Sequence, residues 1–372
     1  MSSRFKPVLL CVIVSLIFTA CFPTGYKETK EKNGKQEELS IEELNSSENE
    51  SISYDFDMNE DYPEECGIYS VEYRPWDEEK VRRVFFGSDD KGIYSYEYHK
   101  KSEYVEDKEE EYRHFYELED GRRICCDAGQ LSYSIYDAEK EDVTEYGMYP
   151  SVFSQFRGDE ESIREWLPEE NLQSFSVENG KKRVEEIITE LDLPVDLNKV
   201  QIYAINAASH EWMEQNFMID MKKLPDAYML VYPVGFEEVC VAPISEQWNS
   251  ALEVQVCGSY VVAVFTENRL EYFEFCKPIS KGNFIRKETI YSKMQAIMAI
   301  KEHMNSMSVK RGESCKISGG VLQYVYMKKP IDMTGQFEIK PYWIFYQTKK
   351  KPDGMLFHRS IFVDAVTGQI FE

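Results

Sequence analysis

Histidine is scarce in this sequence, and the short motifs that mark common enzyme classes are missing. The five histidines never stand at H-x-x-x-H spacing, so the H-E-x-x-H pattern of a helix-borne zinc site is absent. There is no G-x-S-x-G motif and no glycine-rich phosphate loop. No two cysteines are spaced as C-x-x-C, which argues against zinc ribbons and thioredoxin-like redox sites. The sequence therefore predicts no metal and no cofactor, and it identifies no catalytic residue.

Basic residues are also in short supply. The 372 residues include 43 Lys and Arg against 67 Asp and Glu, a net charge of −24. Neutralisation of phosphates supplies most of the affinity for nucleic acids, so this charge argues against a nucleic-acid partner. Apolar residues make up 42% of the chain and aromatics 14%, which is enough for a packed core. A fibrous or wholly disordered chain is thereby excluded.

The sequence has no apolar run long enough to span a bilayer. The longest, Val8–Phe18, has eleven residues broken only by Ser15, whereas a hydrocarbon core of ~30 Å needs about 20. Arg4 and Lys6 precede this run and small residues follow it, as in a secretory signal peptide. The end of the run, Phe18-Thr19-Ala20-Cys21, resembles the bacterial lipobox, although Phe18 stands where that pattern usually has Leu, Val or Ile.

The lipobox resemblance implies that residues 1–20 form a lipoprotein signal peptide. It also implies that Cys21 becomes the lipidated first residue of the mature protein, carrying diacylglycerol and palmitate-type acyl chains. Two or three acyl chains on one cysteine anchor a protein stably to a membrane. An ordinary cleaved signal peptide with an incidental cysteine is the alternative.

A strongly acidic stretch follows the proposed cleavage site. Residues 27–65 contain fourteen Asp and Glu, four Lys and few apolar side chains. Such a composition buries too little apolar surface to offset the entropy of ordering. The sequence therefore predicts a disordered tether over residues 21–61, serving as a spacer between the membrane and the folded part. A partner-binding acidic arm is the alternative.

The remaining cysteines do not form a closed disulfide framework. Seven of the nine lie after Cys21, an odd number, and several stand inside apolar, strand-like runs where cysteine packs as a small hydrophobe. Cys125 and Cys126 are adjacent and could form a redox or metal pair, but neighbours on a strand point to opposite faces.

The pattern after residue 62 is typical of an α+β protein. Helical spacing occurs over 77–85, near 161–166, over 177–191 and after the capping-box pattern Ser292-Lys293-Met294-Gln295. Short strand-like runs rich in tyrosine and phenylalanine lie between these segments. Helix plus antiparallel strands, two or three times over, predicts α+β units rather than a parallel βαβ fold.

The C-terminal residues Asp364-Ala365-Val366-Thr367-Gly368-Gln369-Ile370 resemble the terminal hairpin of PepSY-type domains. Asp364 can accept hydrogen bonds from backbone N–H groups ahead of it, and Gly368 can take a positive φ. The proline-aromatic run Lys340–Phe345 is similar too. The chain thus resembles an uncharacterised family of Gram-positive surface lipoproteins with tandem PepSY-like units. The resemblance implies an N-terminal α+β region at 62–173 and PepSY-like units at 174–280 and 281–372.

The function that the resemblance favours is protein binding or regulation at the cell envelope, without catalysis. The expected location is the outer face of the cell membrane of a Gram-positive bacterium, with an envelope protein as the partner. An exported hydrolase acting on cell-wall or glycan material is the alternative. Residues 277–359 carry 16 Lys and Arg against 6 Asp and Glu. This basic region is either a solvated face that complements the acidic part of the chain, or a patch for an anionic polymer or acidic peptide.

Overall fold

The structure, a computed structural model, describes most of the chain from residue 51 onward. The described residues are 51–58, 61–87, 94–100, 111–127, 130–137, 142–143, 145–156, 159–217, 224–236, 239–244, 247–249, 254–280, 282–306, 312–328 and 336–371. All of them belong to one compact unit, Ser40–Glu372. The predicted signal peptide, Cys21 and most of the predicted tether lie outside the described residues.

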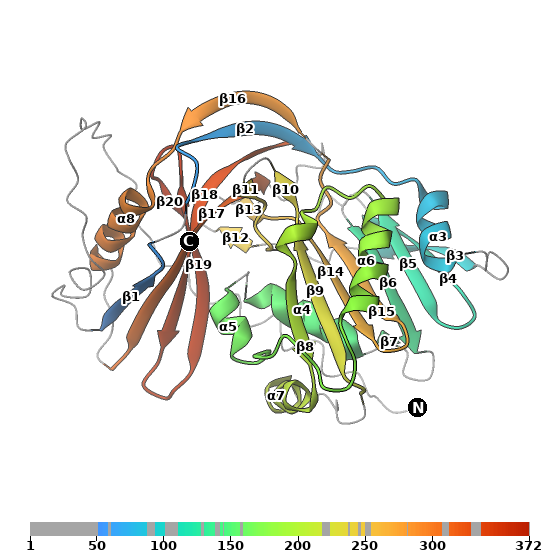
Figure 1. Cartoon of the computed structure of the whole chain (residues 1–372). Helices are drawn as coiled ribbons and strands as arrows, with labels where there is room; N and C mark the ends of the chain where they lie inside the picture. The colour runs from blue at the N-terminus through green and yellow to red at the C-terminus, as the bar shows by residue number, and fades with distance from the viewer. Residues whose placement is uncertain are drawn as a thin grey trace. The chain divides into compact units, whose positions relative to one another are not determined.

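The first of two large sheets is antiparallel throughout and contains nine strands (Figure 1). In spatial order its strands are β3 (Tyr94–Lys100), β4 (Glu111–Glu117), β5 (Arg122–Asp127), β6 (Gln130–Asp137), β15 (Leu270–Cys276), β14 (Tyr260–Thr266), β9 (Ala227–Pro233) and β8 (Gln201–Ile205), with β7 (Asp142–Val143) paired to β6. Strands β6 and β15 join two four-stranded meanders that are far apart in the sequence.

Helices cover both faces of this first sheet. One face packs against α3 (Glu78–Phe86) and α6 (Glu178–Glu190), and the other against α4 (Met148–Gln155), α5 (Glu160–Arg164) and α7 (Ala207–Phe217). A strand that is covered on both sides needs apolar residues at every position rather than at alternate ones. Strand β14, YVVAVFT, meets this requirement and is buried along its whole length.

The second sheet also has nine strands. Its main path is β12 (Gln247–Asn249), β13 (Val254–Cys257), β17 (Ser314–Lys328), β18 (Gln336–Lys350), β19 (Leu356–Asp364) and β20 (Ile370–Phe371). Three further strands complete it: β1 (Ile52–Phe56) is parallel to β17, β2 (Glu65–Glu72) pairs with β18, and β16 (Asn283–Thr289) pairs with β2. Helix α8 (Lys293–Ser306) packs on one face.

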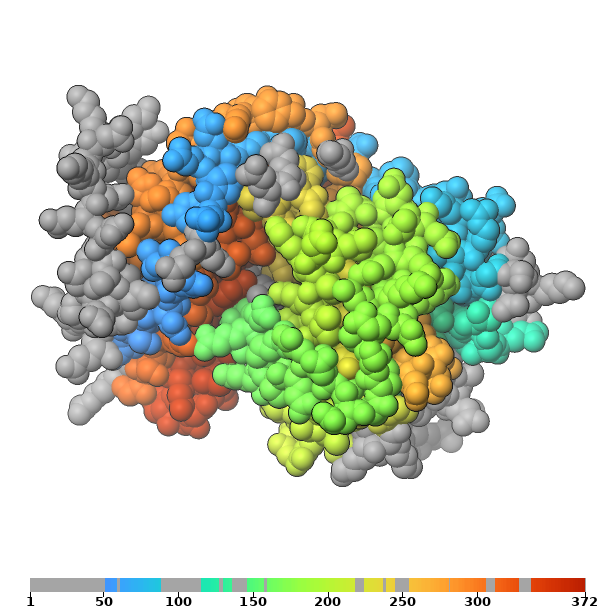
Figure 2. Space-filling model, in the orientation of Figure 1, coloured from blue at the N-terminus to red at the C-terminus, as the bar shows by residue number. Residues whose placement is uncertain are grey.

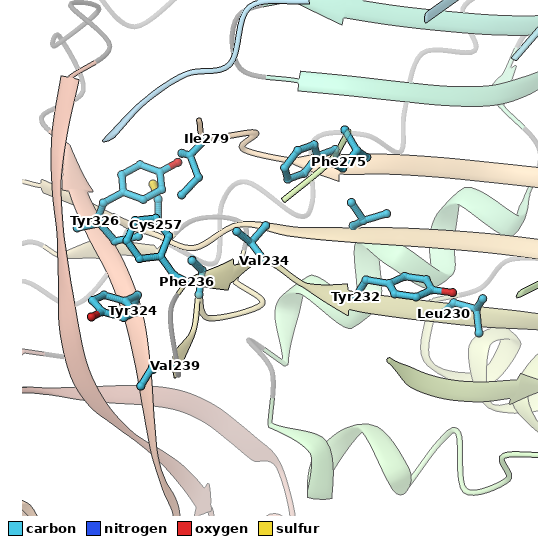
Figure 3. Close-up of a cluster of buried hydrophobic side chains, with 14 of the residues drawn as sticks. Leu230, Tyr232, Val234, Phe236, Val239, Cys257, Phe275, Ile279, Tyr324 and Tyr326 are labelled. Atoms are coloured by element: carbon cyan, nitrogen blue, oxygen red, sulfur yellow. The ribbon is translucent and has the colours of Figure 1, made fainter. Parts of the chain in front are cut away.

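The two sheets share one hydrophobic core. The short ribbon of β10 (Gly235–Phe236) and β11 (Val239–Cys240) brings Phe236 to Tyr324 of β17, with ring centroids 5.3 Å apart. The backbone N–H of Ala242 donates to the carbonyl of Tyr324 over 2.9 Å. Figure 3 shows these side chains meeting Val234, Cys257 and Ile279. Residues from both sheets therefore form one continuous apolar cluster.

The element order repeats one plan three times. A helix is followed by four strands that form an antiparallel meander: α3 precedes β3 to β6, α6 precedes β8, β9, β14 and β15, and α8 precedes β17 to β20. The expectation of a mixed α/β chain with mostly antiparallel sheets is confirmed. The capping box at Ser292 is also confirmed, since its N–H donates to Gln295 Oε1 over 2.8 Å and its Oγ accepts from Gln295 N–H over 3.2 Å.

Two predictions need correction. The tether predicted over 21–61 is wrong at β1, where Ile52, Tyr54 and Phe56 are buried and alternate with exposed residues. The region predicted over 62–173 is divided, because β2 joins the second sheet while α3 to β6 belong to the first. Inside β17, Gly319 and Gly320 make a bulge at which both residues have φ near +83°.

Candidate functional site

The predicted turn residues Asp364 and Gly368 lie together between β19 and β20. Asp364 is 1% exposed, and its Oδ1 accepts from the N–H groups of Val366 and Thr367 at 2.9 and 3.1 Å. Its Oδ2 is 2.6 Å from the Lys340 ammonium. Gly368 has φ +72°, and its N–H donates to the carbonyl of Asp364. Within the turn, the carbonyl of Ala365 accepts a hydrogen bond from the N–H of Tyr291, which lies just before α8.

This turn is a structural joint rather than a binding site. It ties the end of β19 to the start of α8, and Trp343 Nε1 donates to the Tyr291 carbonyl over 2.9 Å from the neighbouring strand. A Cβ at residue 368 would lie 2.9 Å from the Tyr291 ring, so glycine is required there for space as well as for φ.

Removing the Asp364 carboxylate should therefore destabilise the fold. Asp364→Ala leaves two backbone N–H groups and the Lys340 ammonium without their acceptor, and we expect a loss of about 3 kcal/mol in the free energy of unfolding. Asp364→Asn keeps an acceptor for the backbone groups and should lose about 1 kcal/mol. Urea unfolding of both variants measures this difference. Equal stability of the alanine variant and the parent would contradict the role of the turn.

Strand β16 offers an exposed sheet edge. Its residues are exposed except Glu288, and Phe284 and Ile285 are 60% and 46% exposed. In the described part of the chain it pairs only with β2. The pairing shifts register between Phe284 and Arg286, so Ile285 forms a bulge. Figure 1 and Figure 2 show β16 along the upper rim of the second sheet. Large apolar side chains on an edge strand are unusual, because natural proteins normally protect such edges.

A cavity lies beside this edge strand. It has a volume of about 660 Å³, and its lining includes Tyr69, Phe236, Ile279 and Gly282. Tyr69 also contacts Phe284, with ring centroids 5.7 Å apart. Cavity and edge are therefore adjacent through a single tyrosine. The size lies within the usual range for a pocket that receives an apolar group. Sequence reasoning missed this site, because β16 and β2 meet only in the folded chain.

A serine, a histidine and an aspartate meet between the two sheets. Ser162 Oγ donates to Asp159 Oδ2 over 2.6 Å and lies 3.2 Å from Nδ1 of His358, which is also 3.2 Å from Thr348 Oγ1. Burial raises the pKa of Asp159, partly offset by its hydrogen bonds to Ser162. In a hydrolase triad the histidine lies between the serine and the acid. Here Ser162 lies between the aspartate and the histidine instead. Ser162 is 5% exposed and therefore has little access to solvent. Its contact with His358 joins α5 to β19.

The seven cysteines of the described residues are all buried, and they are present as thiols rather than disulfides. Cys240 lies beside a cation: its Sγ is 3.6 Å from Lys199 Nζ, in a second cavity of about 440 Å³ that Trp343 also lines. Burial raises the pKa of Cys240 despite the nearby ammonium, which keeps the thiol protonated and unreactive. Cys125 and Cys126 are buried on β5, and only Cys126 belongs to the core that the two sheets share. The described residues include no group of His, Cys, Asp and Glu that could hold a metal ion.

His210 of α7 is buried against Tyr149 of α4, with Nδ1 2.7 Å from the phenol oxygen. Burial lowers the pKa of His210, so the folded protein favours the neutral ring. The unfolded chain therefore binds a proton first as the pH falls below about 6.5. His210 therefore leaves the free energy of unfolding unchanged above that pH and lowers it progressively below.

We expect the free energy of unfolding to fall by up to about 1.4 kcal/mol through His210 between pH 7.5 and 5.5. His210→Gln should remove this part of the pH dependence. His303→Gln on α8, a half-buried position, should retain it. Urea unfolding at both pH values measures the three slopes, and an unchanged slope in the His210 variant would contradict the assignment.

Comparisons with known proteins place the fold but name no function. No protein-family model and no curated protein matches the chain. The structure is similar to the crystal structure of an uncharacterized protein from Eubacterium rectale ATCC 33656, with a TM-score of 0.62 and 12% sequence identity. The match covers 88% of this chain and 92% of that one. At this identity the likeness concerns the fold alone. Among the described residues, no helix is both long enough and apolar enough to cross a bilayer.

Proposed function

We propose that this chain is an extracellular lipoprotein, held at the membrane by a lipid on Cys21, that binds an extended segment of another envelope protein along β16. The observation that carries the binding role is the exposed edge of β16 with Phe284 and Ile285, together with the contact between Phe284 and Tyr69, which lines the neighbouring cavity. The location rests on the signal-like residues 1–20 and the lipobox-like Phe18–Cys21.

The binding mode that fits this edge is strand addition. Backbone groups of an added strand supply affinity, and side-chain pockets supply selectivity. The bulge at Ile285 interrupts regular pairing there, so a partner strand would pair along residues 286–289 and place an apolar side chain against Phe284. Ion pairs hold the polar side chains of this half: Arg286 with Glu288 at 2.7 Å and Lys287 with Glu65 at 3.0 Å. A charged, bulged edge resists pairing with copies of itself, which favours a specific partner.

The units at 174–280 and 281–372 are proposed to be PepSY-like. The order of elements supports this, because each of these segments contains a helix, α6 or α8, that is followed by the strands of a four-stranded antiparallel meander. In the second segment β16 precedes the helix. The Asp364 turn and the run Lys340–Phe345 lie in the second unit. Insertions complicate the first unit: β12 and β13 lie between β9 and β14 in the sequence but join the second sheet.

The alternative, an exported hydrolase, rests on the Ser162 and His358 contact. Its weakness is access. Ser162 is buried where α5 meets β19 and lines neither of the two cavities described above. Its hydroxyl proton is directed to Asp159 rather than to the histidine that would have to accept it. The geometry favours binding over hydrolysis.

Replacing the proposed lipidation site tests the anchor. Cys21→Ser should abolish incorporation of radiolabelled palmitate and move the protein from the membrane fraction into the medium, since one thioether-linked lipid holds it there. Cys66→Ser, a change at a buried core cysteine, should leave labelling intact. Incorporation of palmitate by the Cys21 variant at the level of the parent would contradict lipidation at Cys21.

Site-specific crosslinking in cells tests the β16 site. A photoreactive phenylalanine analogue at Phe284 should yield one discrete protein adduct, because an added strand would cover that side chain. The same analogue at Met58, another exposed apolar residue, is the matched control and should yield no such adduct. Absence of an adduct at position 284, or the same adduct at both positions, would count against strand addition at β16.

A further inference from the structure

The hairpin between β18 and β19 combines two features that soluble surfaces seldom combine. Its tip exposes three consecutive large apolar side chains, Met355, Leu356 and Phe357, at 53%, 44% and 39%. Three consecutive lysines, residues 349–351, lie on the opposite arm. Lys351 places its ammonium 4.2 Å from the centre of the Phe357 ring. Apolar and cationic groups thus occupy one small surface, in a protein whose net charge is −24.

The tip is a defined turn. Gly354 has φ +88°, and its N–H donates to the carbonyl of Lys351 over 2.9 Å. The Asp353 carboxylate accepts from the N–H of Met355 over 3.0 Å, so this acid is occupied within the turn. The other nearby acid, Glu313, is largely buried and pairs with Lys349 at 2.7 Å. Lys350 is exposed, and it and Lys351 keep the surface cationic.

The described chain begins at the same end of the second sheet. The carbonyl of Ser51 accepts from the N–H of Cys315 over 2.8 Å. Cys315 is paired with Lys349 of β18, and Lys349 is paired with Phe357 of β19. Figure 1 shows β1 and the β18–β19 hairpin at this end of the sheet. Ser51, the first described residue, therefore lies at the end of the sheet where the hairpin turns.

We propose that the β18–β19 hairpin, residues 349–357, is a second membrane contact that inserts into an anionic bilayer beside the lipid anchor. Apolar side chains at the tip would enter the interfacial region, and the lysines would meet anionic headgroups. A basic patch beside an acyl chain is one of the combinations by which proteins hold to a membrane. The 29 residues between Cys21 and Ser51 span at most about 100 Å, so the anchor permits this contact.

The bilayer is preferred over two other occupants. An anionic wall polymer would satisfy the lysines but gives no reason for three exposed apolar side chains in a row. The acidic stretch before Ser51 offers charge but few apolar residues. The inference rests on the proposed lipoprotein function for its setting, but its test uses protein without lipid, so the two can fail independently.

The test is sedimentation with vesicles. The chain from residue 21, carrying Cys21→Ser, is mixed with vesicles of phosphatidylcholine alone or with one third phosphatidylglycerol. This chain keeps the whole compact unit, Ser40–Glu372. We expect binding to the anionic vesicles only. Lys350→Gln with Lys351→Gln should weaken it about 25-fold, from about fivefold per lysine. Replacing Met355, Leu356 and Phe357 together by serine should weaken it at least tenfold.

The matched control is Phe284→Ser with Ile285→Ser, which removes the exposed apolar pair of β16 and should leave vesicle binding unchanged. Urea unfolding of every variant checks that the fold is intact. Equal loss in the β16 control would indicate unspecific adhesion and overturn the proposal. Failure of the parent protein to bind anionic vesicles would overturn it too. If the lysine variant loses vesicle binding and the triple serine variant keeps it, charge alone drives the binding. That result would contradict insertion of the apolar tip and would assign the surface to anionic polymers instead.

Discussion

Two strands of fifteen residues, β17 and β18, impose the main constraint on this fold. Each has two edges whose backbone groups need partners along the whole length. Strands β17 and β18 pair with each other, and their outer edges are each shared by two shorter strands. Strand β1 pairs with the first part of β17 and β13 with its end, while β2 pairs with the first part of β18 and β19 with the rest. The N-terminal, middle and C-terminal parts of the chain are thereby joined in one sheet.

The same constraint creates the exposed features on which the proposed function depends. Strand β2 is held by β18, and β2 in turn holds β16, which therefore ends the sheet. At the other end, β18 extends as far as Lys350 before it turns into β19, and the tip of this hairpin exposes its apolar side chains. Edge and tip are consequences of strand length rather than separate additions to the fold.

Local signals in the sequence were sufficient to predict most of the elements but not their partners. Helix α6 follows from Val184, Ile187 and Ile188 at helical spacing, and α8 from its capping box. Helix α7 was missed because its apolar residues do not form a clear stripe. The signal that could have found it is Asn206, whose Oδ1 accepts from the N–H groups of Ala208 and Ser209. Strand β1 was missed because its three buried residues stand within an acidic composition.

The candidate sites were predictable from the sequence only where their contacts are local along the chain. The turn at Asp364 is local, so its hydrogen bonds follow from the residue types. The β16 edge depends on a pairing between residues 65–72 and 283–289, and the hairpin's relation to Ser51 depends on β1 lying beside β17. Neither pairing has a signature within one segment, because it is decided by which surfaces remain to be covered after the helices and meanders have formed.

The pairing of β1 with β17 has a consequence for biosynthesis. Ile52 is made about 260 residues before Cys315, its neighbour in the sheet, and such a separation is among the slowest kinds of contact to form. The second sheet cannot close until nearly the last strand has emerged, so the early segments must wait without their partners. A chain that stays open until its final strand arrives is well suited to passage through a narrow translocation channel before it folds.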